Sequence, residues 1–60
     1  MESYEKLKAL VAAAEEEVLK VEGGNKAAGT RLRKQMQEIK KACQDVRQAV
    51  LELREKPAAQ

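Results

Sequence analysis

The feature that most constrains this chain is a single turn signal between two long stretches of regularly spaced apolar residues. The turn signal is Gly23-Gly24-Asn25, because two glycines free the backbone to reverse direction and asparagine readily caps a following helix. Before the turn, apolar residues alternate at intervals of three and four: Tyr4, Leu7, Val11, Ala14, Val18 and Val21. After the turn, the same spacing continues through Gly29, Leu32, Met36, Ile39, Cys43, Val46, Val50 and Leu53. The pattern predicts two amphipathic helices, at about residues 3–22 and 26–56.

The two apolar rows match each other when the helices run antiparallel. Residues that face each other then have a constant sum of residue numbers, from Val21 with Gly29 at the turn to Tyr4 with Val46 at the open end. The sequence therefore predicts an all-α fold, with one domain formed by an antiparallel, coiled-coil-like hairpin of two helices.

The ends of the helices and the single cysteine carry weaker signals. We expect Ser3 to cap the first helix and Pro57 to stop the second, which leaves a short tail at residues 57–60. Cys43 falls in the middle of the second apolar row, so we interpret it as a small buried residue. The chain has no histidine to activate this thiol, and no metal-ligand set or nucleophile–base pair can be assembled. We therefore expect no enzyme activity, no cofactor and no metal.

A hairpin of 60 residues is too small to bury a large core by itself, so we expect it to self-associate. A four-helix dimer is the first expectation and a tetramer is the alternative. The expected interface combines a strip of small apolar residues beside the seam with the overhanging end of the second helix. Its residues are Leu10, Ala28, Ala42, Ala49, Val50, Leu51 and Leu53.

The charge is distributed unevenly along the chain. Residues 1–22 carry six acids and three lysines, a net charge of −3, whereas residues 23–60 carry nine bases and four acids, a net charge of +5. In the second helix one base recurs every seven residues, at Lys26, Arg33, Lys40, Arg47 and Arg54, with Lys34 and Lys41 beside them. Such a row can bind a phosphate backbone without reading base sequence.

The basic row also has a second interpretation, as one half of a set of surface ion pairs. In the expected register Lys26 faces Glu22 and Arg33 faces Glu15 across the hairpin. Arg31, by contrast, is expected to point away from the first helix and to lack an acidic partner, and the same holds for Lys34.

The residues from Gly24 to Lys34 resemble the "GNKAA…R.R" signature of the histone H1-like proteins of chlamydiae and of short homologues in other bacteria. The likeness covers most of residues 3–56. It implies a nucleoid-associated protein that binds DNA and compacts it, with Asn25 shaping the turn and Lys26, Arg31 and Arg33 contacting DNA. The chlamydial proteins continue into a long tail rich in Lys, Ala and Pro, whereas this sequence ends at Gln60, so strong compaction is not expected of it.

The combined prediction is a nucleoid protein of the bacterial cytoplasm that binds double-stranded DNA without sequence specificity, with two copies bridging DNA. The expected DNA-binding residues are Lys26, Arg31, Arg33, Lys34, Lys40 and Lys41. The chain has one tyrosine and no Phe or Trp, so it lacks the aromatic platforms that bind single strands. Neither a membrane nor a small-molecule substrate is expected as a partner. The alternative is a coiled-coil module that binds a partner protein and has no role with nucleic acid.

Overall fold

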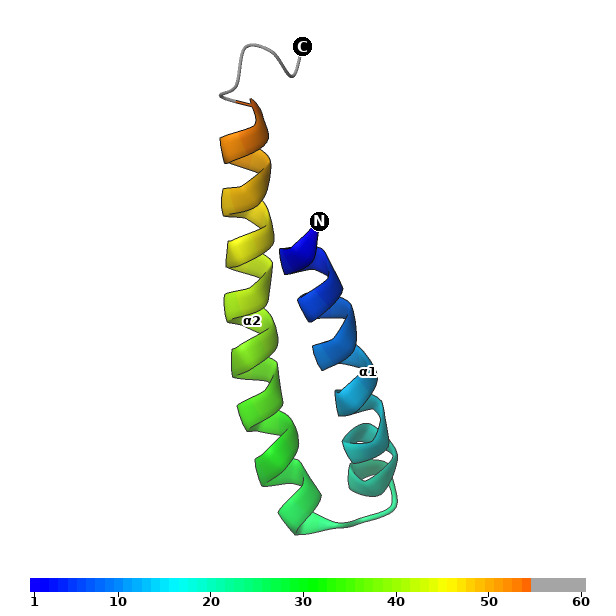
Figure 1. Ribbon diagram of the computed structural model, residues 1–60. Helices are drawn as coiled ribbons and strands as arrows, with labels where there is room; N and C mark the ends of the chain where they lie inside the picture. Colours follow the sequence, from blue (N-terminus) through cyan, green and yellow to red (C-terminus); the bar gives the residue numbers. More distant parts are fainter. Residues whose placement is uncertain (55–60) are drawn as a thin grey trace.

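The chain folds into two long helices that lie side by side and are joined by a short turn (Figure 1). The structure is a computed structural model, and it describes residues 1–54. Helix α1 spans Glu2–Glu22 and helix α2 spans Lys26–Arg54. The all-helical hairpin expected from the sequence is thereby confirmed. The expected last residues of the second helix, 55–56, and the tail at 57–60 lie outside the described residues.

The turn satisfies the backbone groups that the two helix ends leave open. The amide of Asn25 donates to the carbonyl of Lys20 at 2.9 Å, and the amide of Gly24 donates to that of Val21 at 2.9 Å. This pair of bonds closes α1, and it requires Gly24 to adopt a φ of +96°, a region that residues with a Cβ avoid. The side-chain oxygen of Asn25 then accepts a hydrogen bond from the amide of Ala28 at 3.0 Å, which makes it the expected cap of α2.

The start of α1 differs from the expectation. Met1 occupies the cap position without a side-chain hydrogen bond, and the amide of Glu5 donates to the carbonyl of Met1 at 3.1 Å. Ser3 therefore lies inside the helix, where its hydroxyl oxygen is buried and has no hydrogen-bond partner among residues 1–54. The prediction of a Ser3 cap was wrong because the helix begins before that residue.

The two helices meet along a seam of small residues. Within the described part of the chain the only fully buried residues are alanines: Ala14 and Ala42 are 3% exposed and Ala28 is 0% exposed. The half-buried residues follow the same alternating spacing. In α1 they are Ser3, Leu7, Leu10, Glu17, Val18 and Val21, and in α2 they are Gly29, Leu32, Gln35, Ile39, Val46 and Ala49.

This seam keeps most residues of the expected rows but is rotated toward Ala28 and Ala42, so four residues of those rows were placed wrongly. Tyr4, Val11, Met36 and Cys43 were expected inside the seam but are exposed. The alanines of α2 lie at its centre, because side chains of one methyl group let the helices approach closely, which larger side chains in those positions prevent.

The strip of small residues that was expected to join two copies lies in this seam instead. Ala28 and Ala42 are buried against the chain's own first helix, and Leu10 and Ala49 are half-buried there. These residues therefore pack within the hairpin, and a contact of theirs between copies stays a prediction. The overhanging residues remain outside it: Val50, Leu51 and Leu53 are 40%, 50% and 50% exposed.

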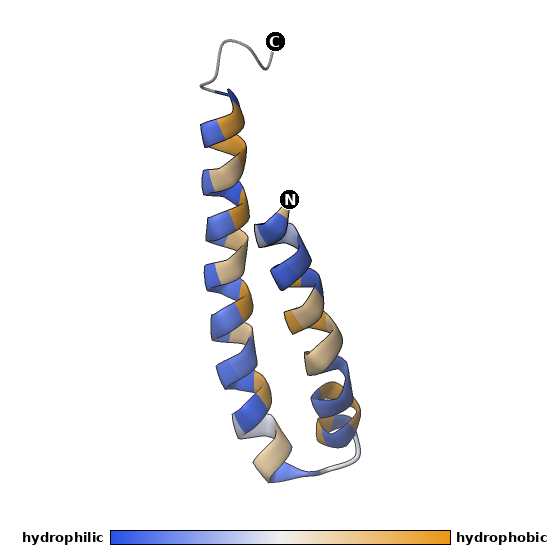
Figure 2. Ribbon diagram, in the orientation of Figure 1, coloured by the Kyte–Doolittle hydropathy of each residue, from blue (hydrophilic) through white to orange (hydrophobic). Residues whose placement is uncertain are grey.

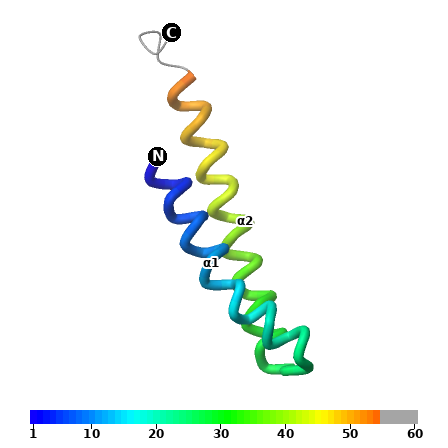
Figure 3. Tube along the Cα trace, turned by 90° about the vertical axis from the view of Figure 1, so that its right-hand side faces the viewer, coloured from blue at the N-terminus to red at the C-terminus, as the bar shows by residue number. Residues whose placement is uncertain are grey.

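Helix α2 extends well past the start of α1, as two perpendicular views show (Figures 1 and 3). The apolar residues of α2 continue into this overhang (Figure 2). The molecule is elongated as a result, with principal extents of 51 × 14 × 12 Å.

Candidate nucleic-acid interface

The bases that recur every seven residues in α2 form a row along one side of that helix. We call them the basic stripe: Lys26, Arg33, Lys40, Arg47 and Arg54. All five residues are exposed. At a rise of 1.5 Å per residue the stripe is about 42 Å long. It is therefore longer than one turn of duplex DNA, which measures about 34 Å.

Within residues 1–54, no acid of the same chain forms an ion pair with the stripe. Within residues 1–54 the ion pairs are Lys8 with Glu5, at 3.4 Å, and Arg31 with Glu17, at 3.1 Å. The contacts that were expected from Lys26 to Glu22 and from Arg33 to Glu15 do not form in the hairpin. Charge and exposure together leave the stripe available to an anion outside the chain.

Arg31 is the exception among the predicted DNA-binding residues. Its Nε donates to Oε2 of Glu17 at 3.1 Å, and its Nη2 lies 3.1 Å from Oε1. The Glu17 side chain is only 15% exposed, so this charge-assisted hydrogen bond and the ion pair beside it tie the start of α2 to the last turns of α1. The expectation that Arg31 has no acidic partner was wrong. The spacing of Glu17 could have identified this partner, because Glu17 stands three residues after Ala14 and four before Val21, in the row of the seam.

The contact also changes the acidity of Glu17. The hydrogen bond from Arg31 lowers the pKa of the carboxyl group, and the positive charges of Arg31 and Lys20 lower it further. Partial burial acts in the opposite direction but does not cancel these effects. Glu17 is therefore held in its ionised form, which strengthens its hold on Arg31.

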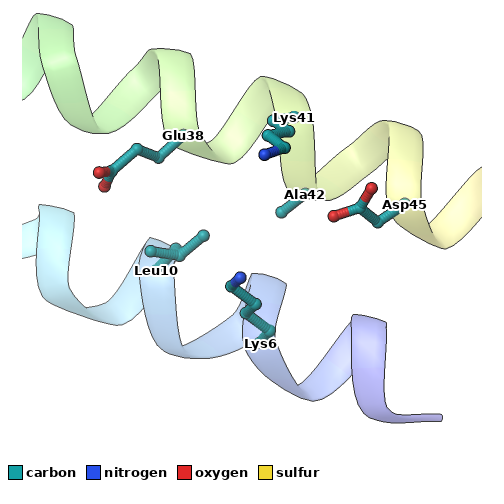
Figure 4. A pocket seen from close by; sticks show the side chains of 6 residues that line it. All are labelled: Lys6, Leu10, Glu38, Lys41, Ala42 and Asp45. Atoms are coloured by element: carbon teal, nitrogen blue, oxygen red, sulfur yellow. The ribbon is translucent and has the colours of Figure 1, made fainter.

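The opposite side of α2 carries a balanced mixture of charges. Lys41 lies there with Glu38 and Asp45, and Lys6 of α1 completes the rim of a shallow hollow (Figure 4). Its floor is formed by Leu10 and Ala42 of the seam. Two lysines facing two carboxylates attract a polyanion less than the uninterrupted stripe does. Lys34 is exposed next to this side and has no ion pair in the described part of the chain.

The basic stripe borders an open apolar groove that sequence reasoning did not foresee. The groove is lined by Val11, Ala14, Glu15, Val18, Met36 and Ile39. A neighbouring hollow brings Met36 together with Arg33 and Lys40 of the stripe. The signal was present in the sequence, since the groove consists largely of the apolar rows that were assigned to the seam.

Other kinds of site find no support in residues 1–54. No group of three or more His, Cys, Asp or Glu side chains is placed to hold a metal ion there. None of the helices in this range is long and apolar enough to cross a membrane. No polar or charged residue is fully buried within it.

An exposed row of cations on a narrow helical rod defines a small helical protein suited to an extended anionic partner. Comparison with protein families refines this class. A family model described as histone H1-like protein Hc1 matches residues 1–56. The chain belongs to this histone H1-like family, a family of structural DNA-binding proteins, and the resemblance seen in residues 24–34 is confirmed. Comparisons with curated proteins and with solved structures found no match.

Proposed function

We propose that this protein binds double-stranded DNA in the bacterial nucleoid, without sequence specificity, through phosphate contacts of the basic stripe. The observation that carries the proposal is the stripe itself: five exposed cations at intervals of seven residues, none of them ion-paired within residues 1–54. Membership of a histone H1-like family supports the same function.

The mechanism is electrostatic. Lysine and arginine side chains replace the counterions condensed on the duplex, and the released ions supply the free energy of binding. Phosphates carry no sequence information, so duplexes of different sequence should bind with similar affinity. If one stripe contacts about five phosphates, the logarithm of the binding constant falls with the logarithm of the salt concentration with a slope of about −4.5.

The predicted site residues contribute unequally in this proposal. Lys26, Arg33 and Lys40 lie on the stripe and contact phosphate directly, and Lys34 extends the positive surface around α2. Lys41 contributes less, because it shares its side of the helix with Glu38 and Asp45. Arg31 has a structural role first, because a phosphate must compete with Glu17 for its guanidinium group.

A pair of matched variants tests the proposal. Lys40→Gln/Arg47→Gln removes two charges from the stripe, whereas Lys6→Gln/Lys20→Gln removes two charges from α1 and leaves the stripe intact. Binding to random-sequence duplexes is measured against salt by fluorescence anisotropy. The stripe variant should bind more weakly, with a slope shallower by about 2, and the control should stay close to the wild type. Equal losses in both variants would show that net charge acts without a defined surface.

A second candidate function has one observation in its favour. The exposed apolar groove could hold a helix of another protein, as expected for a coiled-coil interaction module. The DNA titration separates the two functions, because such a module does not bind the duplex even at low salt.

A further inference from the structure

One charged residue lies in the seam between the two helices. Within residues 1–54 Glu17 is the only charged residue that is not exposed, and its side chain is 15% exposed. Taking a carboxylate out of water costs free energy unless a nearby cation compensates it. A glutamate in a seam of alanines therefore requires a specific partner.

Arg31 is that partner, and it contacts both oxygens of the carboxylate. Its Nε donates to Oε2 at 3.1 Å, and its Nη2 lies 3.1 Å from Oε1. Oε1 is buried and has no hydrogen bond within residues 1–54, so the ion pair with Nη2 compensates its charge. A phosphate that approaches Arg31 meets the negative charge of Glu17 at the same place, which offsets the attraction. Arg31 is half-exposed, but it is not equivalent to the unpaired cations of the basic stripe.

Arg31 also lies on a different side of α2 from the stripe. At about 100° per residue, Arg31 and Arg33 are separated by about 160° around the helix axis. The other residues of α2 in the row of Arg31, at the same spacing of seven, are acids: Glu38, Asp45 and Glu52. Two of these acids line the charged hollow of Figure 4. Arg31 is thus the one cation in an otherwise acidic row of α2, and it is the cation that Glu17 pairs with.

We propose that Glu17 restricts DNA to one side of α2 by keeping Arg31 away from phosphate, a role that rests on the DNA binding proposed above. Glu17 acts through Arg31 and does not touch DNA, so it is a positioning residue. Without Glu17 the start of α2 would present cations on two opposite sides, Arg31 on one side and Lys26 with Arg33 on the other. With the pair formed, the stripe attracts phosphate, and the acidic row points away from the duplex.

Two properties of the pair keep it closed when DNA is present. Glu17 is held beside Arg31 by the fold, and opening the pair would leave an uncompensated carboxylate in the seam. A partly buried pair is also screened by salt less than the exposed contacts of the stripe are. Consistent with this, the hydrogen bond from Arg31 lowers the pKa of Glu17, so the carboxylate is ionised at neutral pH.

A matched pair of substitutions tests this role. Glu17→Gln keeps the size of the side chain and removes its charge. Glu16→Gln removes the same charge from an exposed neighbour that has no ion pair within residues 1–54. Binding to a random-sequence duplex is measured against salt by fluorescence anisotropy. With Arg31 free to contact one more phosphate, Glu17→Gln should bind about three- to tenfold more tightly at about 0.1 M salt, with a slope steeper by about 0.9. Glu16→Gln should change the affinity by less than about twofold and leave the slope unchanged.

The gain in affinity must depend on Arg31. In Glu17→Gln/Arg31→Gln both charges of the pair are removed, so no uncompensated carboxylate remains in the seam. This double variant should return to the affinity and slope of the wild type. It is compared with Glu17→Gln, so any loss of hairpin structure that the glutamine causes is common to both chains. The NMR signal of the Arg31 Nε–Hε group gives a second readout: DNA should leave it unchanged in the wild type and shift it in Glu17→Gln.

The contrary results are distinct from one another. A gain that persists in the double variant would show that Glu17 repels DNA directly and would overturn the role of Arg31. A shift of the Arg31 signal when the wild type binds DNA would show that phosphate already displaces Glu17, which also contradicts the proposal. If the wild type binds the duplex but Glu17→Gln has the same affinity and slope, the role of Glu17 alone is refuted. Absence of binding by the wild type and all variants at low salt would refute DNA binding itself, and this role with it.

Discussion

Two glycines of this chain should respond in opposite directions to the same substitution. An alanine side chain at Gly29, in the first turns of α2, would meet nothing within 4 Å. The same is true of Gly24 in the turn, but Gly24 has a φ of +96°, whereas Gly29 has helical geometry. The two sites therefore differ in backbone conformation and not in available space.

The expected magnitudes follow from this difference. Gly29→Ala should stabilise the protein by about 0.8–1 kcal/mol, because alanine has less backbone entropy to lose in a helix. For a domain of this size that corresponds to a rise in Tm of about 4–8 °C. Gly24→Ala should destabilise the protein by about 1–2 kcal/mol, the cost of left-handed geometry for a residue with a Cβ.

Thermal unfolding followed by circular dichroism at 222 nm measures both effects. The scans are repeated at two protein concentrations tenfold apart, since any change in self-association shifts Tm with concentration. The reasoning fails if both glycine variants shift Tm in the same direction. It also fails if Gly29→Ala is neutral or destabilising at the lower concentration, where contacts between copies contribute least.

Three further substitutions test the turn, the seam and the ion pair of the hairpin. Asn25→Ala should cost about 1 kcal/mol in urea unfolding by removing the acceptor for the Ala28 amide, while Asn25→Asp, which keeps an acceptor, should cost little. Ala42→Leu should destabilise the hairpin by about 1–3 kcal/mol because the site is buried, and Cys43→Leu should lie within about 0.5 kcal/mol at low concentration; equal effects would contradict the observed seam. The pKa of Glu17 lies below its ordinary value of 4.5, so its stabilising contribution is complete above that pH and is lost as pH falls through the lowered pKa. Arg31→Gln should raise this pKa in an NMR titration, and an unchanged value would show that Arg31 does not hold the carboxylate.

The hairpin and its turn could be predicted because their signals are local. The glycine pair breaks a helical pattern, and Asn25 occupies the position from which its side chain reaches the Ala28 amide. The antiparallel packing follows from two matching apolar rows on either side of one short turn. Neither inference requires knowledge of which row lies at the centre of the seam.

The seam could be predicted only in part, because residues such as Leu7, Val18 and Ile39 lie in it as expected while hydrophobicity also selected residues that the hairpin leaves exposed. The apolar spacing selects Met36 and Val11, whereas the hairpin places the neighbouring Gln35 and Leu10 in the seam and leaves Met36 and Val11 exposed. Helix pairs can approach closely along small residues even when polar side chains accompany them. Large apolar residues next to such a seam then form a second surface, which a single sequence does not distinguish from the first.

The candidate site was likewise predictable only in part. The basic stripe could be identified from its spacing of seven residues, which keeps Lys26, Arg33 and Lys40 on one side of α2. The pairing of Arg31 with Glu17 was not predicted, because the two residues are 14 apart in sequence and the glutamate lies in the seam. Ion pairing across the hairpin, rather than the distribution of charge along the sequence, decides which cations remain available to bind phosphate.

The central claim is that the stripe binds duplex DNA through its phosphates. The most direct test is a salt titration of the wild-type protein with two labelled duplexes of unrelated sequence. The account predicts similar affinities for both duplexes and parallel plots with a slope of about −4 to −5, as expected when roughly five phosphates are contacted. Absence of binding at low salt, or a slope near zero, would contradict the claim and favour a partner protein that binds in the exposed apolar groove.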